Sequence, residues 1–77
     1  MVQAYILIQT EVGKSATVAQ AIREVAGVAS AEDVTGPYDV VVRVAAATMD
    51  DLGRLVVSRV QMIEGITKTT TMPVVNL

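Results

Sequence analysis

The sequence predicts an α+β domain whose elements follow the order β-α-β-β-α-β. Several segments either alternate apolar and polar residues or are rich in β-branched residues, which is typical of strands. Two segments between them repeat apolar residues every three or four positions, which is typical of amphipathic helices. The 77 residues suffice for one small domain, with 52% of them hydrophobic. That is more apolar surface than a globule of this size hides, so we also expect contacts between subunits.

The first strand and helix are expected before residue 28. Residues 2–9 form the strand, because the residues of one of its two faces are all apolar, namely Val2, Ala4, Ile6 and Ile8. Ser15 is expected to cap the helix, and Gly27 to end it. The buried stripe of this helix is predicted to consist of Val18, Ala21, Ile22, Val25 and Ala26.

A β-hairpin is expected in the middle of the chain. Residues 28–35 read as an edge strand, because Glu32 and Asp33 discourage further pairing on that side. Gly36-Pro37 marks a turn. Residues 38–45 contain the highest density of β-branched side chains and are predicted to form a central strand. The short connection favours antiparallel pairing of these two strands.

The second helix and the last strand complete the order. Thr48 is expected at the N-cap, with Asp51 three residues later in the manner of a capping box. The buried stripe is predicted to consist of Leu52, Leu55, Val56, Val60 and Ile63. Gly53 lies inside the helix, either because something packs closely there or because its cost is tolerated. Gly65 ends the helix, and residues 66–72 form an edge strand because Pro73 follows.

This order, with right-handed crossovers, predicts a ferredoxin-like βαββαβ fold. Such a fold is a four-stranded antiparallel sheet with both helices on one face. The other face would be bare, and strands one and three carry apolar residues on both sides. We therefore expect a two-fold dimer formed by packing of sheet on sheet. A monomer with a moderately apolar open face is the alternative.

The composition excludes several functions. Without Cys or His there is no Cys/His metal site, no disulfide and no histidine catalyst, so we expect no metal, no cofactor and no catalytic residue. The acid pairs Glu32–Asp33 and Asp50–Asp51 are sequence neighbours whose side chains diverge. The net charge of −2 gives no basic patch for nucleic acid. Because no signal peptide or membrane span is evident, a cytoplasmic location is expected.

The turn at residues 35–39 carries the chemistry of a binding site. A glycine turn exposes backbone N–H groups that hold a carboxylate, and Asp39 offers an anion beside it for an ammonium group. This pairing suits the zwitterion of a free amino acid. The alternative is an ordinary hairpin with a solvated Asp39.

Taken together, the motifs resemble those of one known family, the Lrp/AsnC transcription regulators, over essentially the whole chain. The resemblance is to their stand-alone effector domain, called RAM. It rests on Ala4–Ile8 followed by Gly13-Lys14, Val34–Val44 with its Thr-Gly-x-Tyr-Asp turn, Asp51-Leu52 with Leu55-Val56, and Ile63–Ile66 followed by Thr69–Thr71.

The resemblance implies a dimer that assembles further into a ring of eight or ten subunits and binds an amino acid between dimers. The ligand-binding residues it implies are Gly36, Tyr38, Asp39, Thr69, Thr71 and Met72. Asp39 would hold the ammonium group and the loop amides the carboxylate. Tyr38 and Met72 would contact the side chain of the ligand. Pro73 stands where many relatives continue the strand, so contacts are expected to end at Met72.

Full-length relatives carry an N-terminal helix-turn-helix domain, whereas residues 1–77 correspond to the effector domain alone. We therefore expect an amino-acid-sensing regulatory module, not an enzyme, that affects transcription through a full-length partner and does not bind DNA or membranes itself. Met1 favours a naturally short chain. A ligand-free structural oligomerisation module and a small ferredoxin-like enzyme remain alternatives, as does an ACT-type amino-acid-binding domain, which shares the strand order but pairs side by side.

Overall fold

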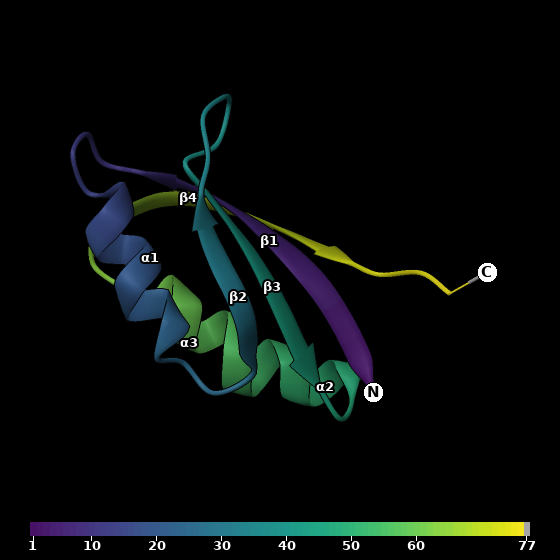
Figure 1. Ribbon diagram of the computed structural model, residues 1–77. Coiled ribbons are helices and arrows are strands. Elements are labelled where there is room, and N and C mark those ends of the chain that lie inside the picture. Colours follow the sequence, from purple (N-terminus) through teal and green to yellow (C-terminus); the bar gives the residue numbers. More distant parts are fainter. Residues whose placement is uncertain (77) are drawn as a thin grey trace.

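A four-stranded antiparallel sheet in the order β2-β3-β1-β4 is the centre of the structure, a computed structural model that describes residues 1–76. Helix α1 and the second helical region lie on one side of this sheet (Figure 1). The elements are β1 (Val2–Thr10), α1 (Ser15–Arg23), β2 (Val28–Asp33), β3 (Val40–Ala46), α2 (Met49–Asp51), the π-helical segment η1 (Leu52–Val57), α3 (Ser58–Gln61) and β4 (Ile66–Pro73). This is the predicted ferredoxin-like fold, with the predicted hairpin between β2 and β3 and with β2 and β4 at the edges.

The core lies between the sheet and the helices. The inward residues of the two central strands are fully buried, and they are Ala4, Ile6 and Ile8 of β1 with Val40, Val42 and Val44 of β3. They face one another in register, since Ile6 pairs with Val42 and Ile8 with Val40. The helices close the core with Val18, Ala19, Ile22, Leu52, Val56 and Val60. The predicted alternation of both central strands is therefore confirmed.

Helix α1 differs from the prediction at both ends. Ser15 is its first residue and not its cap, and Lys14 at the N-cap makes no capping hydrogen bond through its side chain. The helix ends at Arg23, and a turn leads to Gly27, so Ala26 is exposed and lies outside the buried stripe. Gly27 has a φ of +95° and accepts a hydrogen bond of 2.8 Å from the amide of Ala45, which ties this turn to β3.

The second helical region begins as predicted but is not a regular α-helix. The Thr48 side chain accepts a hydrogen bond of 3.1 Å from the Asp51 amide, as an N-cap does. Residues Leu52–Val57 are π-helical, and the amide of Ser58 reaches back five residues to the carbonyl of Gly53. The wider turn buries Leu52 and Val56 but turns Leu55 outward, where it is 47% exposed. The prediction that Leu55 belongs to the buried stripe was therefore wrong.

Gly53 lies in open space, because a Cβ atom built on it would meet nothing within 4 Å. No neighbour therefore requires glycine there. Of the two explanations that the sequence left open, the structure favours the tolerated cost over close packing.

The other face of the sheet carries no helix. The register places Tyr5 opposite Arg43 and Met72, and Leu7 opposite Val41 and Thr70. Tyr5 is 37% and Met72 44% exposed. We call this surface, formed by the outward residues of all four strands, the open face. Arg43 lies over the Tyr5 ring, with its Cζ 5.8 Å from the ring centroid.

Among residues 1–76, no helix has both the length and the apolar character that crossing a membrane requires.

Candidate functional site

The turn between β2 and β3 projects beyond one end of the sheet (Figure 1). Two hydrogen bonds attach it to β1: the amide of Asp39 donates to the carbonyl of Ile8 at 2.8 Å, and the side-chain amide of Gln9 donates to the carbonyl of Pro37 at 2.9 Å. A third, from the amide of Val34 to the carbonyl of Asp39 at 2.9 Å, closes the base of the turn. Gly36 has a φ of +141°, which only glycine adopts without strain. The loop is thus held in place at its base while its tip remains in solvent.

Asp39 is held by an irregularity in β1. The pairing of β1 with β4 shifts register between Gln9 and Thr10. The freed amide of Thr10 donates to Asp39 Oδ2 at 2.8 Å, and the Thr10 hydroxyl lies 3.3 Å from the same oxygen. Within residues 1–76 the other carboxylate oxygen, Oδ1, has no hydrogen-bond partner. The half-buried carboxylate is therefore oriented by one oxygen and offers the other to a cation.

Tyr38 reaches across β1 to the edge strand β4. Its hydroxyl lies 3.3 Å from Thr70 Oγ1. Thr70 is opposite Leu7, so this contact lies on the open face, as does Met72 opposite Tyr5. The structure therefore brings Tyr38 and Thr70 together on the open face, whereas Met72 lies two residues further along β4, away from the hairpin turn.

Thr69 and Thr71 lie on the opposite side of β4. Thr69 pairs with Ile8 and Thr71 with Ile6, both of which face the core. The Thr69 hydroxyl accepts a hydrogen bond of 3.2 Å from Gln61 of α3, on the helix side. The six predicted residues are therefore not one cluster: Thr69 and Thr71 are separated by the sheet from Met72.

Sequence reasoning missed Thr10, Gln9 and Thr70. The alternation of side chains along a strand was a usable signal for Thr70, because residues two apart share a face and Met72 was already a candidate. No sequence pattern marks Thr10, since its role depends on the register shift.

The loop also offers hydrogen-bond donors. Among the described residues, the amides of Gly36 and Tyr38 donate to no protein group, and Gly36 is exposed. Free N–H groups a few residues from an oriented carboxylate can receive the two ends of a zwitterion. No group of three acidic side chains suited to a metal ion occurs within residues 1–76.

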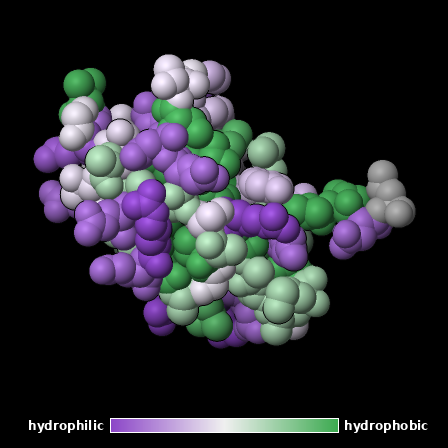
Figure 2. Space-filling view, viewed as in Figure 1, coloured by the Kyte–Doolittle hydropathy of each residue, from purple (hydrophilic) through white to green (hydrophobic). Residues whose placement is uncertain are grey.

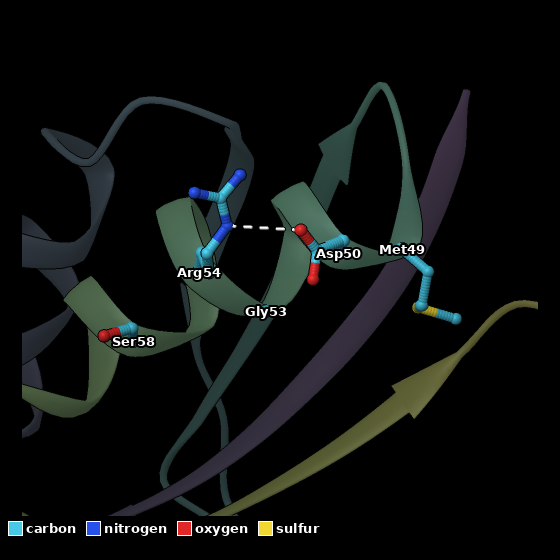
Figure 3. A pocket seen from close by; sticks show the side chains of 5 residues that line it. All are labelled: Met49, Asp50, Gly53, Arg54 and Ser58. Atoms are coloured by element: carbon cyan, nitrogen blue, oxygen red, sulfur yellow. Dashed lines mark ion pairs between the residues drawn. The ribbon is translucent and has the colours of Figure 1, made fainter.

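A hollow of about 610 Å³ lies elsewhere and offers few groups that could bind a ligand. All its lining residues, which include Met49, Gly53 and Ser58, come from the second helical region, where Figure 3 shows Arg54 extended toward Asp50. The Arg54 Nε–Asp50 Oδ2 distance is 3.2 Å, and the two side chains are 66% and 81% exposed. An ion pair this exposed contributes little to the stability of the fold. We therefore regard the hollow as open helix surface and not as a binding site.

The fold is that of a small α+β domain. Its β2–β3 turn, with an oriented carboxylate beside free backbone amides, is typical of a ligand-binding domain. The chain belongs to the Lrp/AsnC ligand binding domain family, whose model matches residues 3–76. This is a family of ligand-binding domains of transcription regulators and not a family of enzymes. The chain is 31% identical over 72 residues to the uncharacterized HTH-type transcriptional regulator PF0250 of Pyrococcus furiosus. That match covers 90% of this chain but 48% of the relative, so the chain spans about half the relative's length.

Solved structures show the same fold over the whole chain. TTHA0845 of Thermus thermophilus is 30% identical with a TM-score of 0.90, covering 100% of this chain and 96% of that one. The hypothetical protein PHS023 of Pyrococcus horikoshii is 31% identical with a TM-score of 0.89, covering 100% and 93%. AsnC of E. coli, at 22% identity and a TM-score of 0.87, shares the fold over 99% of this chain and 52% of its own.

Proposed function

We propose that this domain binds a small amino acid at the hairpin end of the sheet and that binding modulates transcription through a full-length partner regulator. The observation that carries the proposal is the Asp39 carboxylate, fixed by Thr10 and open on its other oxygen. Asp39 receives the ammonium group of the ligand. The amides of Gly36 and Tyr38 receive its carboxylate, and Tyr38 with Met72 contacts its side chain.

A structural relative supports this ligand class. A transcriptional regulator of Neisseria meningitidis, 21% identical with a TM-score of 0.79, is described as a complex with L-Met. The similarity covers 97% of this chain and 50% of that regulator. It shows a common fold, and the ligand named for the relative makes free amino acids the first ligands to try here.

Dimers formed through the open face are part of the same proposal. Tyr5, Leu7, Val41 and Met72 form an apolar strip on that face that water would otherwise cover. Dimers would associate further, into rings of eight or ten, and place an amino acid between them. A full-length partner regulator, and not this domain, would bind DNA. Both proteins would act in the cytoplasm. We assign Thr69 and Thr71 no contact with the ligand. They support β4 from its helix side.

Replacing Asp39 tests the site. Asp39→Asn keeps an oxygen that accepts from the Thr10 amide but removes the charge, so the fold should be retained while amino-acid affinity falls by about 10- to 100-fold. Asp39→Ala also leaves the Thr10 amide unpaired and should lower the free energy of unfolding by about 1–3 kcal/mol. Calorimetric titration measures the affinity, and urea unfolding measures the stability.

Asp33→Asn is the matched control, because it makes the same change of charge in the same hairpin on an exposed residue of β2. It should leave affinity unchanged. Equal affinity in wild type and Asp39→Asn would discard the assigned role. A ligand-free oligomerisation module remains the second candidate, favoured by the exposure of the loop tip, and it predicts no amino-acid binding in any variant.

A further inference from the structure

A second cavity, of about 360 Å³, is lined by residues of the α1–β2 turn, the end of β3 and the second helical region. In Figure 1 these segments meet at the end of the sheet opposite the hairpin turn. Its volume is within the range of about 300–1,000 Å³ that is usual for small-molecule pockets. The lining residues that matter are Ala26, Gly27, Ala47, Leu55, Val56 and Arg59. Neither Asp39 nor any other residue of the hairpin turn contributes to it.

The cavity has a defined cause in the packing. At Gly27 a Cβ would lie 2.6 Å from Val56 Cγ2 and 3.0 Å from the Ala45 carbonyl, so a side chain fits there only if its neighbours shift. Ala26 and the run Ala45–Ala47 add only methyl groups around it. The π-helical segment turns Leu55 outward and thereby provides an apolar wall. In Figure 2 the surface near the end of β3 is correspondingly pale green, that is, mildly hydrophobic.

Two charged side chains, Arg59 and Asp51, lie at the rim of the cavity. Arg59 lines it and, among residues 1–76, forms no ion pair or side-chain hydrogen bond with the protein. The acid on the rim, Asp51, is already engaged, since its Oδ1 lies 3.2 Å from Arg54 Nη2. An arginine fork beside apolar walls matches a carboxylate with a compact apolar body, because the guanidinium binds both carboxylate oxygens.

We propose that this cavity is a second ligand site, which takes a small carboxylate with a branched apolar body. Arg59 holds the carboxylate at the rim. The apolar body lies against Leu55, Val56 and the methyl groups of the alanines. The proposed ligand carries no ammonium group, because Asp51, the acid that lines the cavity, is already paired with Arg54. The residues that line the site do not include Asp39.

The test uses 3-methylbutanoate as the probe and 3-methylbutanamide as its neutral counterpart, with amide chemical shifts followed by NMR on the full chain. Millimolar 3-methylbutanoate should shift the amides of Gly27 and residues 45–47. The affinity should fall about 10-fold or more for the neutral amide and for Arg59→Gln. Lys68→Gln is the matched control, because it also removes one positive charge from an exposed residue but lies on β4 and does not line the cavity, and it should bind like wild type.

The outcomes separate this site from the hairpin site. Asp39→Asn should bind 3-methylbutanoate as wild type does, whatever its effect on amino acids. Absence of shifts at residues 26–27 and 45–47, shifts confined to residues 34–39, or equal affinity in Arg59→Gln would each overturn the proposal. Because Arg59 is exposed, its replacement should leave the unfolding transition unchanged, and that transition is measured on the same samples.

Discussion

Gly27→Ala is expected to lower the free energy of unfolding by about 2–5 kcal/mol, a large part of the stability of a domain this small. Two costs add. The φ of +95° disfavours any residue with a Cβ, at about 1–2 kcal/mol. The new methyl group would also lie 2.6 Å from Val56 Cγ2, so the core must shift at a cost of about 1–3 kcal/mol. Urea unfolding followed by circular dichroism measures the change at fixed protein concentration.

Gly13→Ala is the control for this prediction. Gly13 also has a positive φ, +79°, but a Cβ there would meet nothing within 4 Å. Only the cost of the backbone conformation remains, so the free energy of unfolding should fall by about 1–2 kcal/mol. Equal losses in the two variants would show that the contact between Gly27 and Val56 is not tight and would remove the stated origin of the second cavity.

Leu7→Glu is expected to convert the proposed dimer to a monomer. Leu7 lies in the middle of the open face, between Val41 of β3 and Thr70 of β4. Each dimer would lose two buried leucines, worth about 1.5–3 kcal/mol apiece, and would bury two unpaired carboxylates. The dimer dissociation constant should therefore rise by at least about 100-fold. Size-exclusion chromatography with light scattering at micromolar concentration reads the mass directly.

Met49→Glu controls for the added charge. Met49 is 53% exposed and lies at the start of α2, away from the open face, where an acid also suits the helix dipole. This variant should keep the mass of wild type. A wild-type chain that is monomeric at these concentrations, or a Leu7→Glu variant that is still dimeric, would contradict packing through the open face.

The fold was largely predictable because local and global signals agree. The alternation over residues 2–9 and the β-branched run at 40–44 point to the observed central strands, and the Gly-Pro sequence points to the turn before β3. Right-handed crossovers leave few strand orders for this sequence of elements, and the observed order is one of them. The helix details were less accessible. A π-helical segment gives no distinct spacing of apolar residues, so Leu55 was assigned to the buried stripe although it lies outside.

The site was predictable only in part. The turn chemistry of Gly36 and Asp39 is local and readable, and the structure places both at one sheet end. The contributions of β4 depend on register, and the resemblance selected Thr69 and Thr71 although alternation sends them to the other side from Met72. The contact of Asp39 with Thr10 arises from a shift in pairing between β1 and β4, which no local pattern encodes.

The most direct test of amino-acid sensing is a thermal-shift panel of the wild-type chain against the twenty amino acids at millimolar concentration. A ligand that binds only the folded state, present at 100 times its dissociation constant, stabilises it by about 2.7 kcal/mol. In a domain of this size that raises the midpoint by roughly 10 °C or more. One or two amino acids should produce such a shift, and in Asp39→Asn the stabilisation should fall to about half or less of the wild-type value. A flat panel across all twenty would contradict the account.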